Sequence, residues 1–198
     1  MYSKTNYKKM NIEKLIELAQ NDDINALEEL LRSQQKLIFT TYLYLSNNRN
    51  DVADLTQEAL LRIAKNIKTL KNPKKFKNWS NQIVTHLYYD EIRKKSKNPE
   101  TISIDQEENE QTAFSIKNIL TDQKCRPYEK CISIELENII RAEINNLPQQ
   151  YKITIVLREL LGLSYEEIAN FTKTSIGTVK SRISRARIKL QTVLKNYI

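Results

Sequence analysis

The stretch SYEEIANFTKTSIGTVKSRISRARIKL, residues 164–190, decides the fold of this chain. Ser164 followed three residues later by Glu167 forms a capping box, which satisfies free backbone amides at the start of a helix. The spacing predicts a helix of about two turns over 165–171, a tight turn in TKTS, and a long helix capped by Ser175. Two helices joined by so short a turn are typical of a helix-turn-helix motif.

The long helix that begins at Ile176 has two different faces. Helical spacing gathers apolar side chains on one face and small polar or basic side chains on the other. The apolar face consists of Val179, Ile183, Ala186, Leu190 and Val193, and the opposite face consists of Thr178, Ser181, Arg182, Arg185 and Lys189. Small residues at a helix start let a phosphate approach the backbone amides, and arginines further along reach guanine edges. The pattern predicts a recognition helix for the DNA major groove; the alternative is a solvated basic surface helix.

Eight residues of this segment are predicted to contact duplex DNA. The arginines would read base edges, whereas the lysines and the helix start would bind phosphates. These residues are Ser175, Gly177, Thr178, Lys180, Ser181, Arg182, Arg185 and Lys189. Before them the pattern predicts a helix over 149–160, with Gly162 after its end in a left-handed conformation.

The composition of the whole chain also favours helices. Its 198 residues include two glycines, four prolines and two cysteines, too few turn residues for a β-sandwich and too few cysteines for a disulfide scaffold. Cys125 and Cys131 lack the spacing of a zinc knuckle and are expected to be free thiols, and His86 is the single histidine. The sequence therefore predicts an all-α protein that is not an enzyme and has no catalytic site, metal or cofactor.

Charge divides the chain into blocks. The net charge of +8 and the pI near 9.3 suit a polyanionic partner. Basic side chains outnumber acidic ones by 18 to 11 in residues 1–97 and by 10 to 6 in residues 134–198. Between them, residues 98–133 hold only 4 basic side chains and 7 acidic ones. The acidic middle has no helical period and is predicted to be a flexible linker.

With no run of 18 apolar residues and a polar, lysine-rich N-terminus, the chain is expected to be cytosolic.

Two helical domains are predicted on either side of this linker. An N-terminal segment with a first helix covers 1–24, the first domain covers 25–97, and the second covers 134–198. Three apolar stripes at helical spacing indicate the core of the first domain. They are Leu27, Leu30, Leu31, Ile38, Tyr42 and Leu45; Val52, Leu55, Ala59, Ile63 and Ile67; and Phe76, Trp79, Ile83 and Leu87.

Two surfaces of the first domain stand out. On the helix expected over about 51–68, Asp54, Gln57, Glu58 and Leu61 share a stripe opposite the apolar one, which from the residues alone is a solvated surface. From Lys65 to Lys97 the chain carries ten basic and two acidic side chains interleaved with aromatic residues. Such a segment is typical of single-stranded nucleic acid binding, although the spacing of Phe76 and Trp79 also fits a core position.

These motifs resemble one family. LPQQYKITIVLRELLGLSYEEIANFTKTSIGTVKSRISRARIKLQ is similar to region 4 of the extracytoplasmic-function (ECF) sigma factors of the sigma-70 superfamily. NDVADLTQEALLRI and FKNWSNQIVTHLYYDEIRKK, earlier in the chain, resemble their region 2. The resemblance implies a subunit that binds RNA polymerase core, recognises the −35 and −10 promoter elements and promotes DNA melting. The eight duplex-contacting residues would read the −35 element.

The resemblance also assigns partners. Asp54, Gln57, Glu58 and Leu61 would dock on the clamp helices of the polymerase β′ subunit, and the β flap is a second polymerase contact. The linker would run through the RNA exit path, with Asp105, Glu107, Glu108 and Glu110 facing basic walls, although its composition fits plain disorder equally well. Promoter DNA is implied, an anti-sigma protein is a further candidate partner, and no membrane insertion is expected.

The −10 element would be melted and held by the first domain. The loop IKTLKNPKKFKN would hold a flipped base, and the helix after it would bind the separated strand. The residues implied are Lys71, Asn72, Lys74, Lys75, Phe76, Trp79, His86, Tyr89, Arg93 and Lys94. The chain departs from the family pattern at His86, Tyr88 and Tyr89, which affects the expected base preference and not the fold.

Two other functions share some of these sequence features. A conventional transcription regulator would use the same helix-turn-helix and would bind duplex DNA without polymerase, but would not need the Asp54 to Leu61 stripe. A serine recombinase would need a strand-rich, glycine-containing catalytic region, which the sequence lacks.

Overall fold

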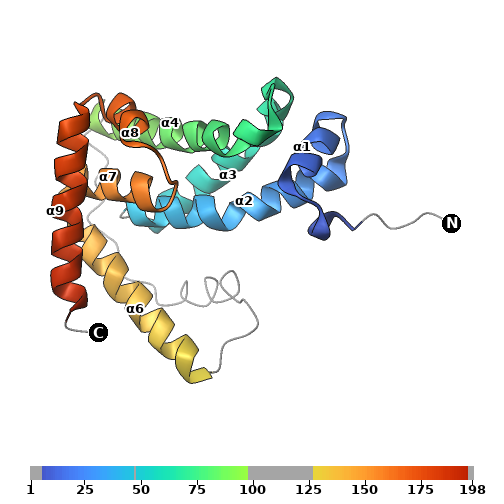
Figure 1. Cartoon of the computed structure of the whole chain (residues 1–198). Helices are drawn as coiled ribbons and strands as arrows, with labels where there is room; N and C mark the ends of the chain where they lie inside the picture. The colour runs from blue at the N-terminus through green and yellow to red at the C-terminus, as the bar shows by residue number, and fades with distance from the viewer. Residues whose placement is uncertain (1–5, 47, 98–126, 196–198) are drawn as a thin grey trace.

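The computed structural model describes residues 6–46, 48–97 and 127–195, and in these ranges it consists of helices joined by short turns (Figure 1). The all-α prediction is confirmed. The elements are η1 (Tyr7–Lys9), α1 (Ile12–Gln20), α2 (Ile24–Leu45), α3 (Arg49–Asn66), η2 (Ile67–Thr69), η3 (Pro73–Lys75), α4 (Phe76–Lys97), α6 (Pro127–Asn145), α7 (Gln149–Glu159), α8 (Tyr165–Thr172) and α9 (Ile176–Leu194).

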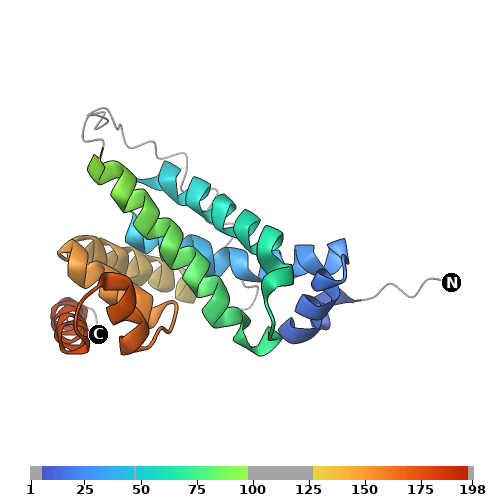
Figure 2. The same ribbon diagram turned by 90° about the horizontal axis from the view of Figure 1, so that it is seen from above.

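Helices α1 to α4 form the first module. Helix α2 packs against both α1 and α3, and α3 packs against α4 (Figures 1 and 2). The amide of Gln20 at the end of α1 donates to the carbonyl oxygens of Ile67 (2.9 Å) and Leu70 (2.7 Å). Helix α1 is thereby part of the first module, whereas the sequence placed it in a separate segment over 1–24.

Helices α6 to α9 form the second module, in which α9 contacts α6, α7 and α8. Helix α6 begins at Pro127, seven residues before the predicted domain start at 134. Proline suits the first position of a helix because its missing N–H has no intrahelical acceptor there. The predicted linker residues 98–126, with Asp105, Glu107, Glu108, Glu110 and Cys125, lie outside the described residues.

The turns of the second module follow the sequence prediction. Gly162 has φ +70°, as expected for the residue that ends α7. In the capping box, the N–H of Glu167 donates to Ser164 Oγ (3.1 Å) and the N–H of Ser164 donates to Glu167 Oε2 (2.7 Å). Helix α8 ends at Thr172, one residue later than predicted, and Lys173 reverses the chain with φ 52°.

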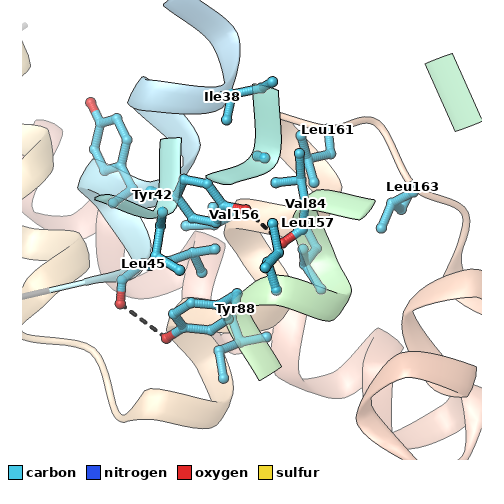
Figure 3. Packing of buried hydrophobic residues seen from close by; sticks show 14 of the residues in the cluster. Ile38, Tyr42, Leu45, Val84, Tyr88, Val156, Leu157, Leu161 and Leu163 are labelled. Atoms are coloured by element: carbon cyan, nitrogen blue, oxygen red, sulfur yellow. Dashed lines mark hydrogen bonds between the residues drawn. The ribbon is translucent and has the colours of Figure 1, made fainter. Parts of the chain in front are cut away.

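One hydrophobic core runs through both modules (Figure 3). Helix α7 packs across the C-terminal half of α2, where Tyr42 of the first module lies near Val156 and Leu157 of the second. Tyr42 donates its hydroxyl to the Val84 carbonyl (2.9 Å) and Tyr88 donates to the Leu45 carbonyl (3.0 Å), which ties α4 to α2. Burial raises the pKa of both tyrosines. Helix α4, which is expected to bind melted DNA, is also hydrogen-bonded to the second module, through Asn81 to the Leu161 carbonyl (2.9 Å) and through Tyr88 to Gln149 (2.7 Å).

Candidate nucleic-acid interface

The start of α9 is built as an open, capped helix end. The N–H of Thr178 donates to Ser175 Oγ (3.1 Å), which confirms Ser175 as the N-cap. A Cβ added at Gly177 would meet only Ser175 Oγ, at 3.7 Å. Nothing in the described chain therefore requires a glycine at this position, and the space in front of it is open to a ligand.

The arginines of the α9 outer face are held by α7. Arg182 donates to Gln150 Oε1 (2.9 Å), and Arg185 donates to the hydroxyl of Tyr151 (3.3 Å). The opposite face of the helix, with Val179, Ile183 and Ala186, is buried as predicted. Helix α7 thus restrains the two side chains expected to read bases.

A third arginine of α9 has a structural partner instead. Arg187 donates to Glu159 Oε1 of α7 (2.6 Å), and this hydrogen bond raises the pKa of the guanidinium. The ion pair is about half exposed, so it adds little to stability.

The remaining predicted duplex contacts lie on the exposed surface of α9. Ser181 and Lys189 are exposed, and Ser181 also donates to the Thr178 carbonyl (2.9 Å). Lys180 lies on the side facing α8, with its ammonium 5.9 Å from the centre of the Tyr165 ring, a ring that Arg158 also approaches at 4.8 Å. Lys180 therefore lies at the edge of the basic face rather than at its centre.

The predicted polymerase stripe lies along one side of α3. Asp54 and Gln57 are exposed, and Leu61 has 52% of its surface accessible, although it is a large apolar residue. Glu58 accepts a hydrogen bond from Arg62 (2.7 Å) within the helix, in a pair about half exposed to solvent. An apolar residue flanked by carboxylates fits a docking surface that excludes water at its centre and attracts basic groups around it.

The loop before α4 is exposed and basic. Lys71, Asn72, Lys74 and Lys75 all face solvent, and Asn72 Oδ1 caps η3 by accepting from the N–H of Lys74 (3.0 Å). At the far end of α4, Arg93 and Lys94 are also exposed and lie 3.6 Å from Asp90 and 3.9 Å from Glu91, respectively. These cations can follow a nucleic acid backbone.

The aromatic residues of α4 divide between core and surface. Phe76 is 2% exposed and packs against Trp79, with ring centroids 5.9 Å apart, so its ring offers no face to a base in this structure. Phe76 therefore occupies the core position that its helical spacing also allowed, as the first residue of the apolar stripe of α4. Trp79 is only partly buried, at the edge of the same core.

Of two other residues predicted to bind the −10 element, one packs against the second module and the other is influenced by a charge on it. His86 is exposed, but its ring lies edge-on to Phe171 of α8, with centroids 5.2 Å apart. Burial raises the pKa of Tyr89 to about 12, while the positive charge of Arg182 on α9 acts in the opposite direction. Sequence reasoning missed these contacts, since no periodicity within one helix reveals its partner across domains.

Among the described residues, no three His, Cys, Asp or Glu side chains gather in a way that could hold a metal ion. None of the helices in the described ranges combines the length and apolar character needed to cross a membrane.

Comparisons with known proteins match a part of each helical module. The family model described as Sigma-70 region 2 matches residues 30–98, and the one described as Sigma-70, region 4 matches residues 137–190. The ECF RNA polymerase sigma-E factor of Haemophilus influenzae is 34% identical over 176 residues, which cover 87% of this chain and 89% of the relative. The ECF RNA polymerase sigma factor SigW of Bacillus subtilis is 29% identical over 94% of this chain and 98% of its own length.

Two solved structures share the fold. CnrH, in complex with the cytosolic domain of CnrY, superposes with a TM-score of 0.56 at 17% identity, over 93% of this chain and 97% of the other. The sigma factor RpoE of Bartonella quintana, in complex with the anti-sigma factor NepR, gives a TM-score of 0.55 at 22% identity, over 84% of this chain and 92% of the other.

Proposed function

Because the chain belongs to the ECF sigma factors of the sigma-70 family, which direct RNA polymerase to promoters, we propose that three separate surfaces divide this task. The α9 outer face reads the −35 element, α4 and the loop before it hold the opened −10 element, and the α3 stripe docks on polymerase. The observation that carries the proposal is the α9 face, a capped helix start followed by two arginines that α7 restrains.

At the −35 element, recognition combines phosphate and base contacts. The amides around Gly177 and Thr178 bind a phosphate, aided by the helix dipole, and fix the position of α9 in the major groove. Arg182 and Arg185 then reach base edges, and Lys189 binds the backbone. Gln150 and Tyr151 orient the arginines beforehand, which lowers the entropy lost on binding.

At the −10 element, the first module captures bases that have left the duplex. Unpairing and flipping a base costs a few kcal/mol, which contacts to the flipped base can offset without nucleotide hydrolysis. The exposed lysines of the loop and η3 hold the backbone, and the partly buried Trp79, at the edge of the core, offers part of its ring to a base. The protein acts by binding and supplies no reacting group, and we place it in the cytoplasm with polymerase and DNA.

The partners follow from the same division of surfaces. Core polymerase binds the α3 stripe through its β′ clamp helices and makes a second contact with the chain through its β flap. The stripe consists of Asp54, Gln57, Glu58 and Leu61. Since CnrH and RpoE were solved with protein partners, CnrY and the anti-sigma factor NepR, we propose an anti-sigma protein as a regulator of this chain too.

A footprinting experiment with and without polymerase tests the function. The chain and core polymerase together should protect specific sites in a library of genomic fragments, whereas the chain alone should protect none at the same concentration. Equal and specific protection by the chain alone would instead favour the conventional regulator, which needs no polymerase.

A further inference from the structure

We infer that Gln20 of α1 is a positioning residue for the basic loop over residues 71–75, which α1 thereby holds in place to catch the opened strand. The inference rests on the proposed role of this loop in holding the −10 element. Helix α1 lies beside the turn that joins α3 to α4 and contacts both η2 and η3 (Figure 2). It gives α1, which the sequence placed outside the first domain, a part in strand capture.

The side chain of Gln20 joins two backbone carbonyls of the segment that enters the loop. Its amide nitrogen lies 2.9 Å from the Ile67 oxygen and 2.7 Å from the Leu70 oxygen, so each of its two N–H groups has one acceptor. Carbonyls near the end of a helical segment have few donors within it. Gln20 supplies these donors from a different helix, 47 and 50 residues away in sequence.

The exposed part of the loop lies between two buried side chains. Leu70 before it is 7% exposed and Phe76 after it is 2% exposed, whereas the four predicted DNA contacts between them all face solvent. Phe76 fixes the end of the loop through the core, and Gln20 fixes its start through the Leu70 backbone. Because both ends are already placed, the loop loses less conformational entropy when it binds DNA.

A second polar contact between the end of α1 and this segment is weaker. Lys68 pairs with Asp22, but their side chains are 57% and 79% exposed, and exposed ion pairs add little to stability. Asp22 also has φ 65°, a left-handed conformation that is unfavourable for a residue with a Cβ. The half-buried amide of Gln20 is therefore the stronger of the two contacts.

Substitutions at Gln20 separate its hydrogen bonds from the bulk of its side chain. Gln20→Glu keeps the shape but places carboxylate oxygens against carbonyl oxygens, so it should release the loop as Gln20→Ala does. Gln20→Lys restores a donor and should hold the loop again. Asn21→Ala is the matched control, because the exposed amide of Asn21 donates to the Glu17 carbonyl within α1 (2.9 Å).

Hydrogen exchange of the free chain, followed by mass spectrometry, measures the order of the loop without DNA. The amides of Leu70 and Lys75 donate within the segment, to the carbonyls of Ile67 and Asn72. We expect exchange over residues 70–76 to be about tenfold faster in Gln20→Ala and Gln20→Glu, and near that of the parent in Gln20→Lys and Asn21→Ala. The amides of α7 are the internal reference and should exchange equally in all variants.

Strand capture is measured with core polymerase on a promoter found by footprinting. In Gln20→Ala, the permanganate reactivity of thymines in the opened region should fall about fivefold or more, while the −35 footprint at low temperature and co-purification with core polymerase stay unchanged. Gln20→Lys should restore opening. Gln20→Ala combined with Asn21→Lys carries the same added charge without the contact to the loop, and should open no better than Gln20→Ala.

Unchanged loop exchange in Gln20→Ala, or faster exchange with unchanged opening, would overturn the inference. So would equal effects in Asn21→Ala, or equally faster exchange in α7, because the change would then not be specific to the loop. Exchange is measured without DNA, so a chain in which Gln20 holds the loop but which opens no promoter contradicts the proposed function and not the contact.

Discussion

Lys173 turns the chain between α8 and α9 in a left-handed conformation, with φ 52°. This conformation crowds Cβ in any residue but glycine and costs about 1–2 kcal/mol. Lys173→Gly should therefore raise the free energy of unfolding by up to about 1 kcal/mol, after part of the gain is lost to the more flexible unfolded chain. Urea denaturation followed by circular dichroism measures the change.

A matched glycine substitution separates this effect from the loss of a lysine. Lys195 has φ −58° at the end of α9, so Lys195→Gly relieves no strain and should not raise stability. A gain of equal size at both positions would contradict the explanation from backbone strain.

Gly177 tests whether an external group approaches the start of α9. Because an added Cβ meets nothing closer than 3.7 Å, Gly177→Ala should leave the thermal midpoint unchanged or slightly higher. The methyl group would stand where a phosphate approaches the amides, so binding of polymerase holoenzyme to a −35 element should weaken. Unchanged promoter affinity would show that no phosphate comes close at this residue.

Arg185 and Lys189 lie on one face of α9 but have different proposed roles. Arg185→Ala should cost about 1 to 3 kcal/mol in promoter binding and relax base preference within the −35 site. Lys189→Ala should weaken binding to all sequences alike and flatten its salt dependence. Binding titrations of holoenzyme on a set of −35 variants at several salt concentrations distinguish the two, and identical behaviour would remove the division of roles.

At the scale of the element, the α3 stripe is the part of the structure that can be tested most simply. Asp54→Lys combined with Glu58→Lys reverses its charge around Leu61 and should abolish co-purification with core polymerase, because basic groups on the partner would then be repelled. Both positions lie on the surface of α3, so helicity by circular dichroism should stay the same.

The control for this pair carries the same change in charge elsewhere. Glu17 and Glu28 are exposed on α1 and α2, each in an ion pair within its helix, and Glu17→Lys with Glu28→Lys should keep polymerase binding. Loss of binding in both double variants would point to net charge rather than to the stripe.

Sequence patterns predicted these helices to different degrees. Helix α8 and the start of α9 were predicted within a residue because the side chains of Ser164 and Ser175 cap the first turns of these helices. Helix α6 begins at Pro127, inside the segment 98–133 that was predicted to be a linker, because proline is favourable in the first turn of a helix. Local chemistry fixes a helix end only where a side chain bonds the backbone.

At the scale of the molecule, the sequence predicted two modules but not their contact. The apolar stripe of α2 was identified without its second neighbour, α7, which covers the Tyr42 side of the helix. The partners of Asn81 and Tyr88 lie 80 and 61 residues away in sequence, beyond the reach of any periodicity. Phe76 was included among the base contacts on the family resemblance, although its helical spacing also fitted the core position that the structure shows.

The most direct test of the whole account is run-off transcription with purified bacterial core polymerase on a library of genomic fragments. The account predicts transcripts that start at a defined set of sites, only when this chain and core polymerase are both present, and that are lost with the Asp54→Lys, Glu58→Lys variant. No transcript from any fragment, or the same transcripts from core polymerase alone, would contradict it.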